Sequence, residues 1–344
     1  MADYPFDSDK LDYRVLSQPV SQRDIAEFRQ QTGSEGVSMK SMITVGVVFW
    51  SICLLLMLLQ LTGLVKTDGK LLWGAVFWSV LYTIGCFAYY ITYREQVRLY
   101  RFARLHGLRY LPDLRDPQRN GMIFTVGHSR QARNIMSLVD RSGRTLFELG
   151  NMMYVEGYGR NRRTYSYTYL CIDMRRHLPH MVLDSTRNNL RLFGKNLSSS
   201  LPAAFAKDQR LQLEGDFNNY FTLYAPKEYE RDALYIFTPE VMAAMIDTAA
   251  QFDAEVVDDK LYFYSQRPAF DEALLRRFFR VVQVAGAKFY RRSDYYADER
   301  LTDSRQANTV ALAGKRLQKR GWFVAFVAIV ISLLVMYIVQ LLSH

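Results

Sequence analysis

Three long apolar segments without a single charged residue constrain this chain more than any other feature. They are Met42–Val65, Leu71–Tyr93 and Trp322–Leu342. Each exceeds the roughly 20 residues that a helix needs to cross a bilayer core. A charged residue at the centre of such a helix would cost about 2.5–3.5 kcal/mol, and none is present. The segments therefore predict three transmembrane helices rather than three core helices of a soluble protein.

Lysine and arginine side chains flank these segments mostly on one side. The residues expected to contact lipid headgroups are Arg94, Arg98, Arg101, Arg104, Lys315, Arg316, Lys319 and Arg320. The opposite side has only Lys66 and Lys70 close to a span. Positive flanks stay in the cytoplasm. The pattern predicts a multi-pass protein of the inner membrane, with the N-terminus and central domain cytoplasmic and the C-terminus outside.

The formal net charge of +10 belongs largely to these flanks and does not indicate a nucleic-acid partner, because no recognisable nucleic-acid-binding module accompanies it. Cys53 and Cys86 lie in the apolar segments, which leaves Cys171 as the one thiol of the soluble part. That is no disulfide framework, and it fits a reducing cytoplasm.

The pattern of hydropathy divides the chain into six parts. They are a polar tail (1–40), a transmembrane hairpin (41–93), a juxtamembrane helix and linker (94–117), a cytoplasmic α+β domain (118–290), a return segment (291–320) and a C-terminal transmembrane helix (321–344). Within the tail, a short helix over Ser17–Gln31 is expected, with Ser21 as its N-cap.

Alternating apolar and polar residues predict a series of strands in the central domain. The expected strands are Thr145–Glu156, Thr164–Met174, His180–Leu183, Arg210–Glu214, Tyr220–Tyr224 and Leu234–Phe237, followed by a hairpin of Glu255–Val257 and Leu261–Tyr264 around Asp258-Asp259-Lys260. Two helices are expected, one opening at Thr238-Pro239-Glu240 and one over Pro268–Phe289. The class is α+β with a mainly antiparallel sheet.

The stretch Leu211–Tyr264 carries a motif of the type Tyr-Ile-Leu/Phe-Thr-Pro-x-x-Met. The motif covers Tyr235, Phe237 where leucine is usual, Thr238, Pro239 and Met242, and it follows a turn with Phe217, an aromatic strand with Phe221 and Tyr224, and a short spacer with Ala233. This stretch resembles an uncharacterised bacterial family of membrane proteins with N-terminal transmembrane helices and a cytoplasmic α+β domain of unknown function. The resemblance implies architecture and membrane location, and it implies no catalytic residue.

No pattern of catalytic, cofactor-binding or metal-binding residues stands out. His177 and His180 lie near Cys171, but Pro179 prevents a regular helix from presenting both rings to a zinc ion, and a basic turn between two strands is the favoured interpretation. His128-Ser129 lacks a nucleophile elbow, and Gly157-x-Gly159 lacks the third glycine of a dinucleotide site. We therefore expect no cofactor.

One polar loop is the candidate for binding a ligand or partner. It contains Asp184, Ser185, Arg187, Asn188 and Asn189 and follows a short buried strand. The leading hypothesis is a membrane-anchored interaction or scaffold module that binds a protein partner, or a second copy of itself, beside membrane lipids. The alternatives are an enzyme acting on a lipid or envelope precursor at the inner face, and an accessory subunit of a larger membrane complex. Membrane spans without ionisable groups argue against transport.

Overall fold

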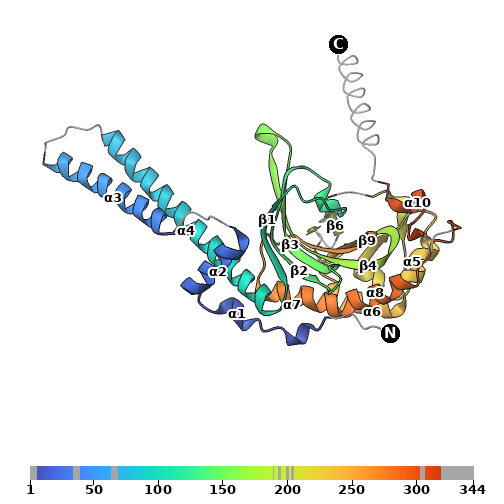
Figure 1. Ribbon diagram of the computed structural model, residues 1–344. Helices are drawn as coiled ribbons and strands as arrows, with labels where there is room; N and C mark the ends of the chain where they lie inside the picture. Colours follow the sequence, from blue (N-terminus) through green and yellow to red (C-terminus); the bar gives the residue numbers. More distant parts are fainter. Residues whose placement is uncertain are drawn as a thin grey trace, which may run out of the picture. The chain divides into compact units, whose positions relative to one another are not determined.

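A computed structural model describes residues 6–33, 39–62, 69–188, 190–192, 195–198, 201–202, 205–302 and 307–318. The chain divides into two compact units, one of Leu11–Pro112 and one of Met1–Lys10 with Asp113–His344 (Figure 1). The predicted helix Trp322–Leu342 lies outside the described residues, as do Lys319, Arg320 and Asn189. Each unit is described by itself below.

Two long helices dominate the first unit. They are α3 (Met39–Leu61) and α4 (Gly69–Leu105), and both are long and apolar enough to cross a membrane. Two hydrogen bonds join these helices. The Tyr82 hydroxyl donates to the Met42 carbonyl at 3.1 Å, and the Trp50 ring nitrogen donates to the Thr83 hydroxyl at 3.1 Å. Two of the three predicted spans are therefore helices with the expected length and composition.

The polar tail is partly helical and packs on α4. Two helices, α1 (Arg14–Ser17) and α2 (Gln22–Thr32), precede α3, and Ser21 and Asp24 form a capping box at the start of α2. Phe28 on α2 is fully buried against Val97 and Tyr100 of α4. The predicted tail helix and its Ser21 cap are confirmed.

Arg101 on α4, which the sequence predicts to contact lipid headgroups, binds the polar tail. Its guanidinium donates to the Val15 carbonyl at 2.5 Å and to the Gln18 carbonyl at 3.1 Å, and it pairs with Asp24 at 3.2 Å. Only 17% of the side chain is exposed, because α1 and α2 cover it. Arg104 pairs with Glu27. Both arginines therefore bind the tail, and Arg101 supplies donors to carbonyls at the end of α1 that the helix leaves without a partner.

Replacing Arg101 with methionine should detach the tail helices from α4. The buried carbonyls and Asp24 would lose charge-assisted hydrogen bonds worth about 2 kcal/mol, which corresponds to roughly thirtyfold faster opening. Hydrogen exchange of residues 14–32 in the full chain measures this. The control is Arg94→Met, because Arg94 only lies over the Tyr90 ring at 5.2 Å. Equal exchange in both variants would contradict the assignment.

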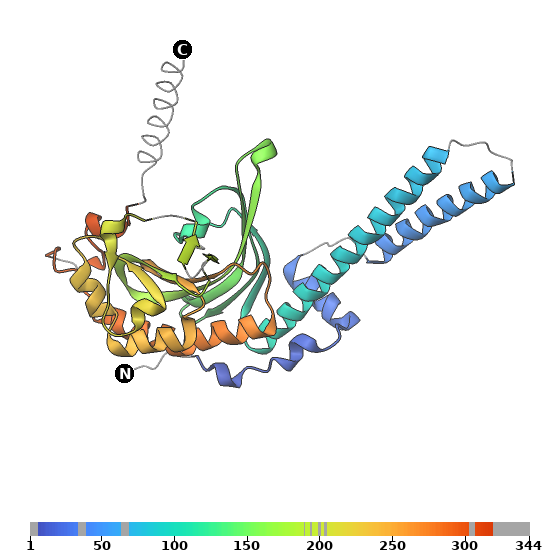
Figure 2. The same ribbon diagram turned by 180° about the vertical axis from the view of Figure 1, so that it is seen from behind.

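A strongly curved antiparallel sheet forms the second unit (Figures 1 and 2). Its strand order is β1 (Arg109–Arg115), β2 (His128–Val139), β3 (Thr145–Glu156), β4 (Arg163–Ser185), β8 (Phe221–Tyr224) and β7 (Arg210–Leu211). The long strand β9 (Asp253–Ser265) also pairs with β4. A separate ribbon consists of β5 (Leu190–Leu192) and β6 (Lys195–Ser198). The predicted α+β class with a mainly antiparallel sheet is confirmed.

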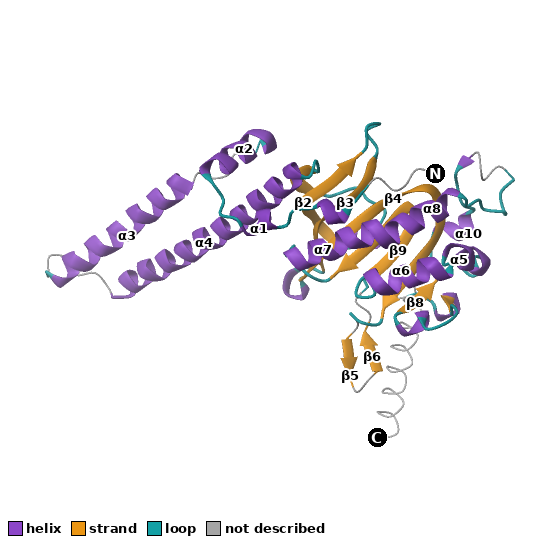
Figure 3. Ribbon diagram, turned by 90° about the horizontal axis from the view of Figure 1, so that it is seen from below, coloured by secondary structure: helices purple, strands orange, loops and turns teal. Residues whose placement is uncertain are grey.

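Helices cover one face of this sheet (Figure 3). They are α5 (Glu230–Ile236), α6 (Pro239–Ala249), α7 (Glu272–Val281) and α8 (Ala287–Asp294), with a π-helical turn, Val282–Gly286, between the last two. A fifth, α10, is Leu312–Lys315. Gly286 lies against Ile172 of β4 so closely that a Cβ there would be 2.5 Å from the Ile172 Cδ1 atom. The two predicted helices are present, but the domain has more than two.

Three strand predictions were wrong. Leu234–Phe237 belongs largely to α5, and the expected hairpin around Asp258 is the interior of the single strand β9. His177 and His180 lie within β4 instead of a turn between two strands. The errors in β4 and β9 have one physical reason. The pairing of these two strands shifts register between Asp173 and Leu178 and again between Leu178 and Met181. These shifts accommodate Pro179, which has no N–H for the ladder.

The return segment is bound to the domain through a buried carboxylate. Asp298 is fully buried and accepts hydrogen bonds from Tyr229 at 2.8 Å, the Ala311 amide at 2.8 Å and the Arg300 amide at 3.0 Å. Burial alone would raise the pKa of Asp298, but these donors hold it below its usual value. The chain before α10 is therefore packed on the domain.

Candidate functional site

The sheet face opposite the helices carries an unusual number of tyrosines. Tyr154, Tyr167, Tyr169, Tyr262 and Tyr264 are all buried there, beside the short helix η2 (Met122–Phe124). Alternation along β4 puts residues 167, 169 and 171 on this face. The register sets Cys171 opposite both Glu148 of β3 and Tyr262 of β9. A row of polar side chains therefore crosses three strands.

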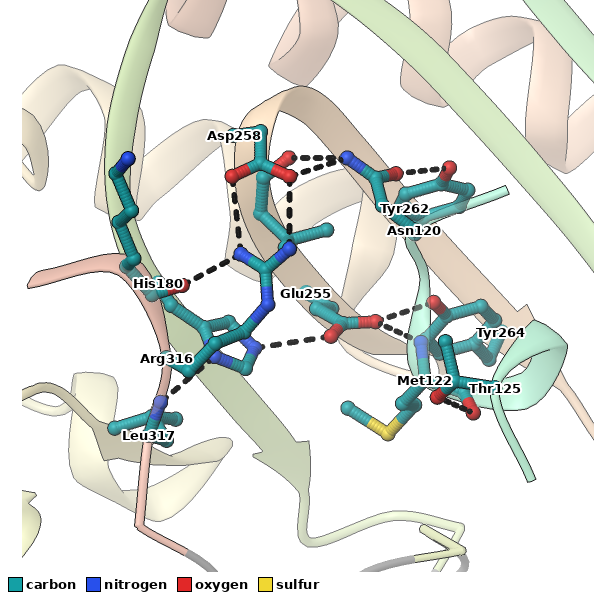
Figure 4. A network of polar contacts seen from close by, with 12 residues as sticks. Asn120, Met122, Thr125, His180, Glu255, Asp258, Tyr262, Tyr264, Arg316 and Leu317 are labelled. Carbon is teal, nitrogen blue, oxygen red and sulfur yellow. Dashed lines mark hydrogen bonds and ion pairs between the residues drawn. The ribbon is translucent and has the colours of Figure 1, made fainter. Parts of the chain in front are cut away.

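A buried glutamate lies at the centre of this face (Figure 4). Glu255 is 1% exposed, and its carboxylate accepts from His180 Nε2 at 2.9 Å, the Met122 amide at 2.7 Å and the Tyr264 hydroxyl at 2.5 Å. Burial and the adjacent Glu255 raise the pKa of Tyr264, which keeps its hydroxyl a donor. Three donors offset the desolvation of the carboxylate.

A bulge explains why Glu255 faces the tyrosines at all. Along a regular strand, residue 255 would lie on the face opposite residues 262 and 264. Asp258 has a positive φ of 54° and sits at an irregular register, so the strand changes its alternation there. Bulges commonly re-aim side chains in this way. As a result, Glu255, Val257 and Tyr262 share one face.

The segment just before the last apolar stretch is clamped by this network. The Leu317 amide donates to His180 Nδ1 at 2.9 Å, so the ring proton belongs on Nε2, where it points to Glu255. Arg316 forms two hydrogen bonds of 3.0 Å with the carboxylate of Asp258. Gln318 exchanges hydrogen bonds of 2.8 and 2.9 Å with Gln209. Arg316 and Leu317 are thus bound to side chains of the sheet (Figure 4).

Asn120 joins this clamp to an open part of the face. Its amide nitrogen donates to Asp258 at 2.8 Å, and its oxygen accepts from Tyr262 at 2.7 Å. Beside it lies a hollow of about 460 Å³, whose lining includes Arg119, Thr145, Glu148, Cys171, Asp173 and Lys260. We call this hollow the charged pocket.

Ion pairs organise the charged pocket. Arg119 pairs with Glu148 at 3.0 Å, and Tyr169 donates to the other Glu148 oxygen at 2.8 Å. Lys260 pairs with Asp173 at 2.9 Å. The pocket is therefore lined by two ion pairs, and each of their carboxylates already has a basic partner.

The thiol at the base of the charged pocket is not activated. Burial raises the pKa of Cys171, with a further contribution from Glu148. Burial also raises the pKa of Asp173, against the influence of Lys260. The thiolate is the nucleophile of cysteine chemistry, and a raised pKa keeps this sulfur protonated. The arrangement can recognise charged groups, and it does not resemble a nucleophile beside its base.

The structure divides the polar loop proposed from the sequence. Asp184 and Ser185 are buried at the end of β4, where the Ser185 hydroxyl donates to the Ala250 carbonyl at 2.6 Å, so they are strand rather than loop residues. Arg187 and Asn188 line a surface hollow of about 280 Å³. Sequence reasoning missed Glu255 and the charged pocket, because both depend on pairing between distant strands.

The histidines considered as catalytic or metal-binding candidates have hydrogen-bond partners within the fold. The backbone amide of His177 donates to the Asn308 side chain at 3.1 Å, and the His128 ring lies 3.0 Å from both the Ser129 hydroxyl and the Gly157 carbonyl. Among the described residues, no group of three or more His, Cys, Asp or Glu side chains could hold a metal ion.

Comparisons with known proteins add little. No protein-family model matches the chain, and no curated protein matches it. A similar solved structure is the crystal structure of the mycobacterial trehalose monomycolate transport factor A, TtfA. It is 13% identical, with a TM-score of 0.36, over 57% of this chain and 94% of that one. Because the likeness is so distant, no function is transferred from it.

Replacing Glu255 with glutamine should destabilise the domain strongly. The glutamine side chain keeps only one acceptor oxygen, and its NH2 group faces groups that are themselves donors. His180 or the Met122 amide is then left without an acceptor. The expected loss is about 2–4 kcal/mol of unfolding free energy, measured by urea unfolding of the full chain in detergent. The control Glu214→Gln changes an exposed residue and should stay within about 0.5 kcal/mol. Similar losses in both would refute the central role of Glu255.

The Arg316–Asp258 pair predicts a pH-dependent contribution to stability. Burial opposes ionisation of Asp258, yet the hydrogen bonds from Arg316 and Asn120 hold its pKa below the ordinary 3.8. A depressed carboxyl pKa stabilises the fold above the unfolded value, and the gain disappears as pH falls through the folded value. Arg316→Gln should therefore cost about 1 kcal/mol at pH 7, and this loss should shrink progressively as the pH is lowered below 3.8. Thermal melts from pH 7 downward through this range test this, and a pH-independent difference would contradict it.

Proposed function

We propose that this protein is a membrane-anchored, non-catalytic interaction module that binds a protein partner through the charged pocket. The helices α3 and α4 are the anchor, and the arginines of the flanks support a cytoplasmic position for the domain. In the same proposal, Trp322–Leu342 forms a third span that ends outside. The domain is then tethered to the inner membrane at both ends.

The charged pocket is the observation that carries this proposal. It is open, and it is lined by two ion pairs, Arg119 with Glu148 and Lys260 with Asp173. Pre-paired charges need little reorganisation when a partner arrives, and complementary charges give specificity to an interface. The matching partner is a polypeptide segment that itself carries both signs of charge.

The same residues give less support to catalysis. An enzyme acting on a lipid or envelope precursor would need an activated nucleophile or a general base free to take a proton. The Cys171 thiol has a raised pKa, and Glu148 is engaged by both Arg119 and Tyr169. Binding is the simpler use of this pocket.

Photocrosslinking in living cells tests the proposal directly. A photoreactive amino acid at the exposed rim position Gln118 should capture one defined partner in the full-length protein. Filling the hollow with Thr145→Trp should abolish at least about nine-tenths of that product, since the bulky ring excludes the partner segment from the pocket.

The matched control places the same large residue at Thr164→Trp, an exposed position of β4 that does not line the charged pocket. This variant should keep the product at the level of the unmodified protein. The proposal fails if Gln118 gives no defined product, or if both tryptophan variants lose it equally while remaining folded by thermal melting.

A further inference from the structure

A second hollow lies away from the charged pocket, where four chain segments meet. The turn after β4 contributes Arg187 and Asn188, and the chain after α6 contributes Gln251. Arg267 follows β9, and Arg277 lies on α7. Together they line a space of about 280 Å³. We call it the arginine hollow.

Positive charge is concentrated in the arginine hollow and only partly neutralised. Arg267 pairs with Asp271 at 2.6 Å, with both side chains 53% exposed. Arg277 donates to the neutral oxygen of Gln251 at 2.6 Å, and Arg187 lies 5.0 Å from the centre of the Tyr220 ring. In the described part of the chain, neither Arg187 nor Arg277 forms an ion pair. These contacts orient two guanidinium groups without cancelling their charge.

Guanidinium groups gathered in one hollow have the donor geometry of a phosphate site, because each fork can hold two oxygens of a tetrahedral anion. The hollow also has an apolar base, since Phe252 and Leu274 are buried beneath it. Its volume exceeds that of a bare phosphate and approaches the lower range of small-ligand sites. The anion therefore belongs to a somewhat larger group.

A second observation specifies that group. The side-chain oxygen of Asn188 is buried and has no hydrogen-bond partner among the residues that the structure describes. A buried acceptor without a donor costs free energy, which a ligand hydroxyl would recover. The surrounding side chains are otherwise rich in donors, so they would meet the anionic end.

We propose that the arginine hollow binds a phosphate group attached to a hydroxyl-bearing polyol, such as a glycerol phosphate unit. Arg187 and Arg277 hold the phosphate oxygens, and the Asn188 oxygen accepts from a hydroxyl. The same chemistry occurs in a free sugar or polyol phosphate and in a glycerol-based lipid headgroup. This site is independent of the charged pocket, so either proposal can fail alone.

Calorimetric titration of the full chain in detergent tests the site with two probes, glycerol 3-phosphate and inorganic phosphate. Glycerol 3-phosphate should bind saturably and more tightly than inorganic phosphate. Arg277→Gln and Arg187→Gln should each weaken its binding roughly tenfold or more, as expected for a lost charge-assisted pair. Asn188→Leu should remove most of the preference for glycerol 3-phosphate over inorganic phosphate.

The matched control is Arg276→Gln, which removes an arginine of the same helix that pairs with Glu272 and does not line the hollow. It should bind glycerol 3-phosphate like the unmodified chain. A second arm measures binding of the chain in nanodiscs with and without phosphatidylglycerol. If phosphatidylglycerol in the nanodisc competes with glycerol 3-phosphate for Arg277, the source of the phosphate is the lipid headgroup. If it does not compete, the source is a free phosphate.

Two results would overturn the site. One is the absence of saturable glycerol 3-phosphate binding in both detergent and nanodiscs. The other is binding that Arg187→Gln and Arg277→Gln leave unchanged, or that Arg276→Gln weakens equally. Melting curves of each variant identify any that fails to fold, and because Arg277 and Arg187 are exposed, their replacement should leave the fold intact.

Discussion

The polar layer of the domain depends on the buried carboxylate of Glu255. Such a carboxylate can leave water only where donors surround it, and its three donors come from β4, β9 and the start of η2. Satisfying that charge brings these segments together. It also fixes the tautomer of His180, whose remaining nitrogen then accepts from Leu317. The hydrogen bond that holds Leu317 is thus linked to the burial of Glu255 through the His180 ring.

The irregular pairing of β4 and β9 places Glu255 on the same face of the sheet as the charged pocket. Without the change of alternation at Asp258, Glu255 would face the helices and Tyr262 the opposite side. With it, Glu255 and the row of Glu148, Cys171 and Tyr262 share one face. The clamp and the charged pocket are therefore two parts of one polar layer, connected through Asn120.

Sequence reasoning was reliable where the signal is local. Ser21 with Asp24, and Pro239 after Thr238, define helix starts by their own chemistry, and both helices begin where predicted. It failed at Asp258-Asp259-Lys260, because a polar triplet looks the same in a turn and in a bulged strand. It also failed at Leu234–Phe237, where four apolar residues fit either a buried strand or the inner face of α5. Arg101 shows the same limit for function, since a flanking arginine can serve lipid or the chain itself.

The ionisable groups of the charged pocket are engaged within the pocket itself. They are either paired with opposite charges or, like Cys171, kept neutral by a raised pKa. Asn120 lines this pocket and also bonds to Asp258, the partner of Arg316. The pocket and the segment that Arg316 holds on the sheet are therefore connected through one side chain.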